Sequence, residues 1–228
     1  MISLIEKSKK LVREMGLPVS LLYILSKLLA GISKRIRLHY YLFVNQKISA
    51  SPRLPAHRGK NFQFQIINKR VPLLDALPRP SEVIDNRFAQ GYVCIAATRD
   101  EEFIGCIWFS LHSYIEDEVR AIFIPLPAGR AAWDFDVYIA PEYRATYLFP
   151  KLWDEADAFL KSQGYESTTS RIEGFNIQSV NSHKKLGADT IARAVYLKAG
   201  TLQLSFCTVY PYLHFSFGEK SIPKYELE

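Results

Sequence analysis

The segment from Trp133 to Gly187 constrains the fold of this chain more than any other part of the sequence. Apolar and polar residues alternate over 133–139, which is typical of a strand with one buried face. This alternation predicts one face made of Trp133, Phe135, Val137 and Ile139 and another made of Asp134, Asp136 and Tyr138. Pro141 ends the strand, and residues 147–162 then carry apolar side chains at helical spacing before the stop signal Gly164. A second strand at 166–172 and a helix after Asn176 are predicted to follow.

Two motifs with fixed spacing lie in this segment. The first is the strand-to-helix turn Ile139-Ala140-Pro141-Glu142-Tyr143-Arg144-Ala145-Thr146-Tyr147-Leu148-Phe149. The second places Asn176, Ser179, His183, Leu186 and Gly187 at offsets 0, 3, 7, 10 and 11. In order and separation the two resemble the motifs of the Gcn5-related N-acetyltransferase (GNAT) superfamily, Val-x-Pro-x-x-Arg-x-x-Gly-x-Gly and Asn-x-x-Ser/Ala-x-x-x-Tyr-x-x-x-Gly.

The resemblance implies an α+β fold with a mixed, mostly antiparallel sheet flanked by helices, preceded by an N-terminal helical extension. It implies an N-acyltransferase, in the simplest case an N-acetyltransferase, that uses acetyl-CoA or another acyl-CoA and no metal. The acceptor would be a small-molecule amine or a peptide amine. Because a fold does not select a substrate, amino sugar, polyamine, peptide N-terminus and lysine stay open as acceptors.

Backbone N–H groups at a helix N-terminus, next to a cation, hold a diphosphate well. By resemblance, the residues that bind acyl-CoA are Ile139, Arg144, Ala145, Thr146, Tyr147, Leu148 and Phe149, with Asn176 and Ser179 along the pantetheine arm. Arg144 supplies the cation, and Thr146 is the predicted N-cap of a helix that starts at Tyr147. Tyr147 and Phe149 stand where the family has glycine or another small residue. A helical φ tolerates both, whereas a positive φ would not.

Acyl transfer to an amine needs a base for the ammonium proton and an acid for the departing thiolate. His183 stands where the family has tyrosine and is the predicted acid, because imidazole exchanges protons near neutral pH. The alternative is a polar residue on an exposed helix face. Asp136 is the first candidate for the base, and Glu142, at the strand exit, is the second. The acidic run at 116–118 could instead attract a cationic acceptor.

Charge is distributed unevenly along the chain. Residues 1–70 contain 14 Lys and Arg against two Glu, a balance of +12, whereas residues 71–228 contain 15 against 21 Asp and Glu, a balance of −6. The acidic part suits a cationic amine better than nucleic acid. Cys94, Cys106 and Cys207 lie in apolar runs without Cys-x-x-Cys or Cys/His spacing. This pattern indicates reduced core thiols in a cytoplasmic protein rather than a zinc site or a disulfide framework.

The N-terminal residues predict two helices. The first covers 1–15, with the apolar residues Ile2, Ile5, Leu11, Val12 and Met15, and the second covers 17–32 and is followed by Lys34, Arg35 and Arg37. The second apolar run is shorter than the about 20 residues that a membrane span needs, and basic residues replace a signal-peptide cleavage site. We therefore expect residues 1–37 to cap the fold, or to lie as a peripheral element on the anionic inner face of a membrane.

The remaining sequence predicts strands at 37–48, 62–67, 92–99 and 103–112, and near 119–124. It also predicts one or two short helices within 71–90, the second capped by Ser81, and a terminal hairpin through Gly200. The predicted organisation is a helical extension with the first strand (1–50), a linker (51–61), a GNAT-like domain (62–218) and a tail (219–228). Two alternatives to the acyltransferase remain. One is an aminoacyl transferase of cell-envelope synthesis, and the other is a catalytically degenerate GNAT-fold module that binds at a membrane surface.

Overall fold

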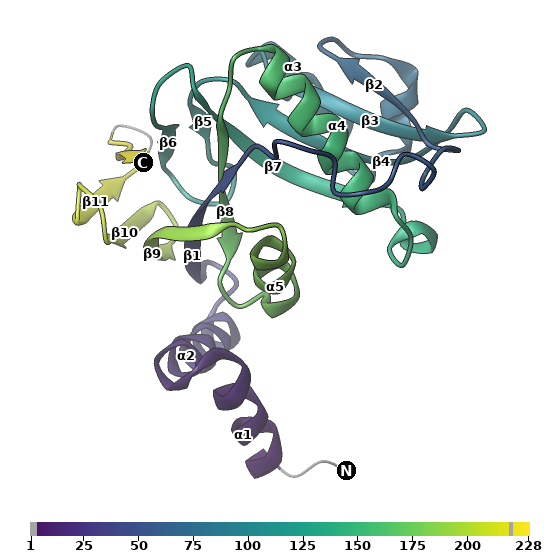
Figure 1. The fold of residues 1–228 in the computed structure, drawn as a ribbon. Coiled ribbons are helices and arrows are strands. Elements are labelled where there is room, and N and C mark those ends of the chain that lie inside the picture. Colours follow the sequence, from purple (N-terminus) through teal and green to yellow (C-terminus); the bar gives the residue numbers. More distant parts are fainter. Residues whose placement is uncertain (1–3, 219–220) are drawn as a thin grey trace. The chain divides into compact units, whose positions relative to one another are not determined.

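The structure is a computed structural model that describes residues 4–218 and 221–228. The chain divides into two compact units. Figure 1 labels the helices and strands of both. The middle unit comprises residues 47–113 and 125–169, and the terminal unit comprises residues 1–46, 114–124 and 170–228. Strand β8 (Ser167–Glu173) contributes residues to both units. Ile2, assigned above to the first helix, lies outside the described residues.

The middle unit is built on a sheet with the strand order β8-β7-β4-β3-β2. Its elements are β2 (Gln63–Ile67), the 3-10 helix η1 (Pro72–Ala76), α3 (Ser81–Ala89), β3 (Val93–Arg99), β4 (Glu102–Ser110), β7 (Ala131–Ile139), the 3-10 helix η2 (Pro141–Tyr143) and α4 (Leu148–Ser162). Neighbouring strands are antiparallel, except that β7 and β8 are parallel. These elements confirm the predicted strands and the two short helices. The predicted cap at Ser81 is wrong, since Ser81 is already helical and Pro80 precedes it.

Local sequence accounts for the two best-defined features of this unit. Asp100 and Glu101 form the turn between β3 and β4 with φ values of 51° and 69°, the left-handed conformation that matches the twist of a tight hairpin. Helix α4 turns one stripe toward the sheet, and the side chains of that stripe are fully buried: Leu148, Leu152, Trp153, Ala156 and Leu160. Gly164 ends the helix region with a φ of 86°, as its position predicted.

The segment predicted as a linker lies along α4. The backbone N–H of Arg53 donates to Asp154 Oδ1 at 2.7 Å, and its guanidinium donates to Asp157 Oδ2 at 2.6 Å. The N–H of Ser49 also donates to Asp157 Oδ2, at 3.0 Å. Burial raises the pKa of Asp157, and its hydrogen bonds with Ser49 and Arg53 oppose that rise. Two buried carboxylates of α4 therefore hold this segment in place.

The terminal unit contains two sheets, one with the order β11-β10-β9-β1-β8 and a smaller one with the order β12-β6-β5. Its elements are α1 (Leu4–Met15), α2 (Leu17–Ile32), β1 (Ile36–Lys47), β5 (Tyr114–Ile115), β6 (Ile122–Pro125), α5 (Ile177–Lys185), β9 (Asp189–Ala199), β10 (Leu202–Cys207), β11 (Leu213–Phe217) and β12 (Lys224–Leu227). Strands β5, β11 and β12 were not predicted from the sequence. Strand β12 lies within the segment predicted as a tail.

Aromatic side chains join the two sheets of the terminal unit. Phe43 of β1 packs edge-on against Phe123 of β6, with ring centroids 4.9 Å apart, and Tyr41 packs against Tyr196 of β9 at 5.3 Å. Tyr225 of β12 contacts both Phe123 and Tyr196, at 6.1 and 6.4 Å. All five side chains are fully buried. Such pairs stabilise a core by about 0.5–1.5 kcal/mol each beyond the area they bury, so β12 is an integral part of this unit.

The predicted N-terminal helices are present, and Gly16, with a φ of 76°, separates them. In α2 the buried Ser20 donates to the Gly16 carbonyl oxygen at 2.7 Å, and Tyr23 packs edge-on against Phe175 at 5.4 Å. Within the described residues, no helix combines the length and hydrophobicity needed to cross a membrane. Cys94, Cys106 and Cys207 are buried, which confirms their assignment to the core.

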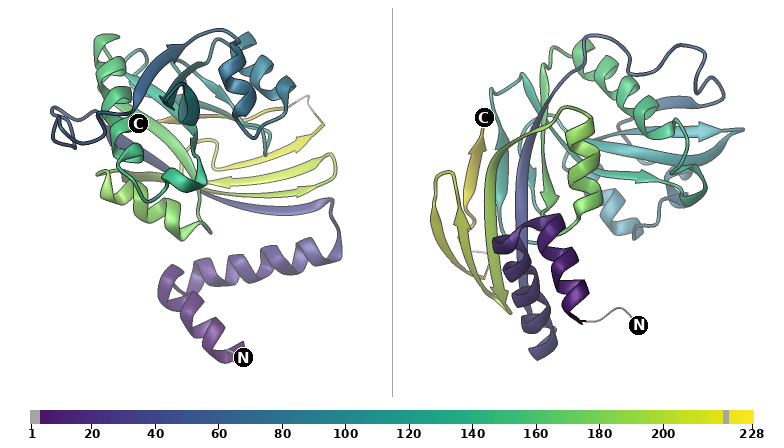
Figure 2. Two further views of the ribbon diagram at one scale, coloured as in Figure 1. Left: turned by 90° about the vertical axis from the view of Figure 1, so that its right-hand side faces the viewer. Right: turned by 60° about the horizontal axis from the view of Figure 1, so that its bottom comes forward.

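Strand β1 lies between β8 and β9 (Figure 2), so we expect the folding of truncated chains to depend on whether they keep it. Deleting residues 1–33 removes α1 and α2 but leaves β1, so we expect a cooperative thermal transition to persist. Deleting residues 1–47 also removes Tyr41 and Phe43, each worth about 3–5 kcal/mol in a core, which is comparable to the whole stability of a domain. Circular dichroism should then show no cooperative melt. A cooperative melt of the shorter chain would contradict the central role of β1.

Candidate active site

Strand β7 contains a bulge where the sequence predicted regular alternation. Cys106 of β4 pairs with Tyr138, but Trp108 pairs with Phe135. Between these two pairs, β4 has one residue and β7 has two, so β7 carries one extra residue. Asp136 absorbs the extra residue with a φ of 47°. Because paired residues of antiparallel strands point to the same side, Phe135 and Tyr138 share a face. The predicted separation of β7 into two alternating faces is therefore wrong beyond Phe135.

The bulge places Asp136 between two arginines of the middle unit. Arg79 donates from Nη2 to Oδ1 at 2.5 Å and from Nε to Oδ2 at 3.0 Å. Arg87 donates from Nη1 to Oδ2 at 2.7 Å, and its guanidinium lies over the ring of Trp108 at 5.0 Å. Both carboxylate oxygens are thus engaged by guanidinium groups. Because both oxygens are occupied by these hydrogen bonds, Asp136 is a weaker candidate for a proton acceptor than its position in the sequence suggested.

The turn after β7 accommodates its aromatic residues without strain. Tyr147 has a φ of −78° and precedes α4, and Phe149 lies inside the helix, so neither position requires glycine. The helix begins at Leu148 rather than Tyr147, so the predicted N-cap at Thr146 is wrong by one residue. Thr146 nevertheless accepts a hydrogen bond from the N–H of Leu148 at 3.2 Å and donates to the Tyr143 carbonyl oxygen at 2.6 Å.

The start of α4 presents free backbone donors and a cation. In the described part of the chain, no hydrogen bond is found for the backbone N–H groups of Ala145, Tyr147 and Phe149. Arg144 is exposed, and its Nε donates to the Ile139 carbonyl oxygen at 3.2 Å, which fixes the side chain beside the turn. Unpaired N–H groups at a helix N-terminus next to an arginine fit an anionic ligand such as the diphosphate of acyl-CoA.

A second arginine at this turn was not foreseen from the sequence. The guanidinium of Arg58 lies over the ring of Tyr147, 4.7 Å from its centroid, and the Tyr147 side chain is itself exposed. Arg58 belongs to the segment that is pinned along α4, so its position depends on tertiary structure. Tyr147, which replaces a family glycine, therefore holds an additional cation beside the helix N-terminus.

In the terminal unit, the second motif forms α5 as predicted. Asn176 caps the helix, and its Oδ1 accepts a hydrogen bond from the N–H of Ser179 at 3.1 Å. Nδ1 of His183 lies 2.9 Å from the Ser179 carbonyl oxygen, which can only accept a hydrogen bond. The proton of a neutral His183 ring therefore belongs on Nδ1, and Nε2 carries the free lone pair. His183 needs a second proton, on Nε2, before it can act as an acid from that atom.

The sequence also gave no sign of a partly buried cluster of polar side chains in the terminal unit. Arg171 of β8 donates to both oxygens of Glu116, at 2.8 and 3.0 Å, and its Nη2 also lies 2.9 Å from Glu118 Oε2. The Tyr41 hydroxyl donates to the same Glu118 oxygen at 2.9 Å, and the Arg171 guanidinium lies over the Tyr41 ring at 4.5 Å. The Glu116 side chain has no exposed surface. Two members of the acidic run are thus tied to Arg171 rather than free to attract a ligand.

The surroundings shift the pKa values of Glu116 and Glu118 in opposite directions. Burial raises the pKa of Glu116, although Arg171 opposes the rise. Burial also acts to raise the pKa of Glu118, but Arg171, the Tyr41 hydroxyl and His39 outweigh it and lower the pKa. Glu118 is therefore the ionised carboxylate that faces the edge of the cluster.

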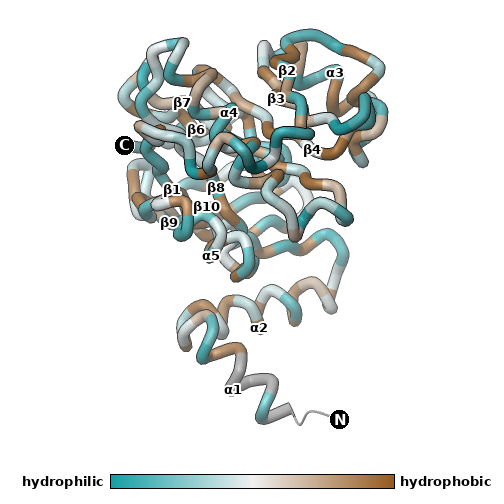
Figure 3. Tube along the Cα trace, turned by 45° about the vertical axis from the view of Figure 1, so that its right-hand side comes forward, coloured by the Kyte–Doolittle hydropathy of each residue, from teal (hydrophilic) through white to brown (hydrophobic). Residues whose placement is uncertain are grey.

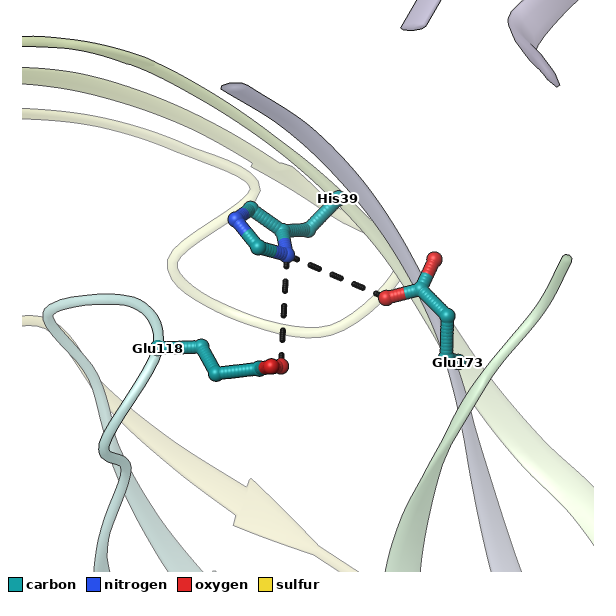
Figure 4. A group of neighbouring side chains, drawn as sticks. All are labelled: His39, Glu118 and Glu173. Atoms are coloured by element: carbon teal, nitrogen blue, oxygen red, sulfur yellow. Dashed lines mark ion pairs between the residues drawn. The ribbon is translucent and has the colours of Figure 1, made fainter. Parts of the chain in front are cut away.

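His39 of β1 completes the cluster (Figure 4). Its Nδ1 lies 4.0 Å from Glu118 Oε2 and 3.8 Å from Glu173 Oε2, and 17% of its side chain is exposed. The three groups offer ligand atoms within 4.8 Å of one another, which is a spacing that a metal ion could use. However, the adjacent Arg171 already neutralises Glu118 and would repel a cation. The arrangement suits a histidine oriented by carboxylates better than a metal centre.

Comparison with known proteins identifies the family. The sequence profile of the Acetyltransferase (GNAT) family matches residues 63–188, which are 126 of the 228 residues. The chain therefore belongs to the GNAT acetyltransferase family, and its α+β fold, with mostly antiparallel sheets and flanking helices, is the one that the sequence predicted. No curated protein sequence matches the chain.

Several solved structures are similar to this chain at low identity. A conserved protein of unknown function from Staphylococcus epidermidis has a TM-score of 0.49 and 11% identity, over 76% of this chain and 67% of its own. A tandem GNAT protein of the clavulanic acid biosynthesis pathway has a TM-score of 0.49 and 11% identity, over 72% of this chain and 54% of its own. A GNAT family acetyltransferase from Elizabethkingia anophelis, solved with acetyl-CoA bound, has a TM-score of 0.40 and 16% identity, over 55% of this chain and 74% of its own.

Proposed function

We propose that this chain is an N-acyltransferase that transfers an acyl group, acetyl in the simplest case, from acyl-CoA to a primary amine. The observation that carries the proposal is the turn at Arg144, inside the segment that matches the GNAT profile. There, three unpaired backbone N–H groups and two arginines surround the N-terminus of α4. This combination fits the diphosphate of a coenzyme A thioester. By the family resemblance, Ile139, Thr146 and Leu148 complete the donor site, and Asn176 and Ser179 serve the pantetheine arm.

The proposal requires binding first and turnover second. Isothermal titration with acetyl-CoA should give a saturable binding curve, and release of free thiol should follow when an amine is added. The amines to compare are an amino sugar, a polyamine, a lysine-containing peptide and a peptide N-terminus. No heat of binding at millimolar acetyl-CoA would reject the donor assignment. Binding without thiol release for any amine would favour a catalytically degenerate module instead.

The chemical step needs two proton transfers. The amine nitrogen bonds to the thioester carbonyl carbon, the carbon–sulfur bond breaks, the ammonium proton passes to a base, and the thiolate takes a proton from an acid. We assign the acid to His183 in its doubly protonated form, since its neutral form has no proton on Nε2. For the base we propose His39, whose ring lies next to two carboxylates. Asp136 and Glu142 are the alternatives, and Asp136 is the weaker of these because two arginines hold it.

Arg58 gives a direct test of the donor site. Replacing Arg58 with alanine is expected to raise the Kd for acetyl-CoA about tenfold, because a hydrogen bond to a charged group is worth about 1.5 kcal/mol or more. Tyr147→Leu should have a similar effect, since it removes the ring on which Arg58 lies. Titration calorimetry measures both. Arg99→Ala, at an exposed arginine of the β3–β4 hairpin, is the matched control and should bind as tightly as the parent chain.

A further inference from the structure

The terminal unit has a sheet face whose pattern of hydrophobicity is inverted. Directly paired residues of antiparallel strands point to the same side. The pairing of β1, β9, β10 and β11 therefore lines up three apolar rows on one face: Ile36-Ala199-Leu202-Phe217, Leu38-Leu197-Leu204-Phe215 and Tyr40-Val195-Phe206-Leu213. Four of these side chains are among the most exposed apolar groups of the described chain: Phe206 at 49%, Leu213 at 61%, Phe215 at 60% and Phe217 at 64%.

On β10 and β11 the opposite face is polar and buried, whereas on β1 and β9 it carries the buried aromatic residues described above. Gln203, Ser205 and Ser216 have no exposed surface. Gln203 is satisfied by the backbone of Arg120, to which it donates and from which it accepts hydrogen bonds of 2.8 Å. In β10 and β11, polar side chains thus point into the interior, while phenylalanine and leucine point outward. An exposed apolar surface of this kind marks an interaction site rather than ordinary surface variation.

Helix α2 lies on the same side as the three rows. Tyr40 belongs to the third row and contacts Phe175 at 5.8 Å, and Phe175 in turn contacts Tyr23 of α2 at 5.4 Å. Beyond this contact, α2 turns an apolar stripe to solvent at helical spacing. Its members are Leu17, Leu21, Ile24, Leu28 and Ile32, all at least 44% exposed, and Figure 3 shows apolar segments along this helix. The helix therefore extends the exposed apolar surface instead of covering it.

Positive charge borders this surface. Residues 1–37 contain eight Lys and Arg against Glu6 and Glu14, a balance of +6. Lys34, Arg35 and Arg37 follow α2, are exposed, and have no carboxylate partner among the described residues. Arg35 lines a shallow hollow together with Ile36, Gly200, Thr201, Leu202 and Phe217, which include members of the first row. A cation and apolar side chains thus meet in one depression.

We propose that this surface, formed by the outward face of β9–β11 and the exposed stripe of α2, binds the surface of an anionic lipid bilayer. Apolar and aromatic side chains would enter the interface between headgroups and acyl chains, and the basic residues would contact anionic headgroups. Tyr210 and Tyr212, exposed in the loop between β10 and β11, are the amphipathic type that favours this interface. A second copy of the chain would explain the apolar area but not the adjacent excess of positive charge. Helix α2 would lie parallel to the membrane surface, since it is too short to span the bilayer.

Vesicle sedimentation tests the proposal with four chains: the parent, two variants of the surface and one control. The parent chain should bind vesicles of phosphatidylcholine with phosphatidylglycerol at least tenfold more tightly than vesicles of phosphatidylcholine alone, and salt should weaken the binding. Phe215→Asn/Phe217→Asn and Lys34→Glu/Arg35→Glu should each reduce binding to the anionic vesicles at least tenfold. The matched control, Ile66→Asn/Ile115→Asn, changes two exposed apolar residues elsewhere (56% and 50% exposed) and should bind like the parent.

Thermal melts show whether each variant is folded. Because the substituted side chains are exposed, we expect the melting temperatures to match that of the parent chain. Equal binding to neutral and anionic vesicles would overturn the proposal, as would full binding by both the phenylalanine and the charge-reversal variants. A third outcome also overturns it. In that outcome the parent chain binds no vesicles, and light scattering shows a dimer that Phe215→Asn/Phe217→Asn dissociates. The surface would then be assigned to contact with a second copy of the chain.

Discussion

Replacing Arg171 with methionine is expected to lower the free energy of unfolding by about 3–5 kcal/mol, because it leaves a buried carboxylate without its counter-charge. Arg171 is the partner of both Glu116 oxygens, and Glu116 has no exposed surface. Burial already raises the pKa of Glu116, and loss of Arg171 would raise it further. Urea denaturation followed by circular dichroism measures the loss.

The pH dependence of this loss has a definite sign. A carboxyl group whose pKa is higher in the folded than in the unfolded state binds more protons in the folded state. Its contribution to the free energy of unfolding therefore decreases as pH rises from the unfolded pKa through the folded pKa. The Arg171→Met variant should therefore lose more stability at pH 8 than at pH 5. Arg130→Met is the matched control, because Arg130 pairs with Glu166 where both side chains are more than half exposed, and it should leave the free energy of unfolding nearly unchanged. Equal losses for the two variants would contradict the assignment.

Replacing His39 with glutamine is expected to reduce kcat/KM for acyl transfer by a factor of about 10²–10⁴, the usual contribution of a general base. Glutamine keeps polarity and approximate size but cannot take up a proton near neutral pH. The loss should appear in turnover and in the pH profile, while the Kd for acetyl-CoA stays close to the parent value. A merely structural role of His39 would instead lower the melting temperature and leave the shape of the pH profile unchanged.

Two further variants separate the candidate bases. Glu142→Gln changes an exposed carboxylate of η2, and Asp136→Asn changes the carboxylate held by Arg79 and Arg87. We expect Glu142→Gln to retain activity, and any loss in Asp136→Asn to be accompanied by a lower melting temperature, because it weakens two ion pairs. Full activity of His39→Gln together with inactivity of stable Glu142→Gln would transfer the role of the base to Glu142.

The sequence predicted most elements because their signals are local. Helical spacing, Gly164 as a stop and a helix after Asn176 each depend on residues a few positions apart, and the structure confirms them. The alternation predicted over 133–139 holds only as far as Phe135. Strands β5 and β12 escaped because they are only two and four residues long, and β11 escaped because its apolar residues face outward. The bulge at Asp136 escaped because a single left-handed residue leaves no mark in the hydrophobic pattern.

The sequence by itself determined the family, since the spacing of the two motifs between Ile139 and Gly187 is a local property of the chain. Only the tertiary structure decided which charged groups are free and which are paired. Arg58 reaches Tyr147 across 89 positions, and Arg171 reaches Glu116 across 55. Such partners are chosen by packing, because a buried charge is stable only where the fold brings its counter-charge to it. Residue type and spacing indicated a GNAT acetyltransferase, and long-range contacts selected the groups proposed here for its chemistry.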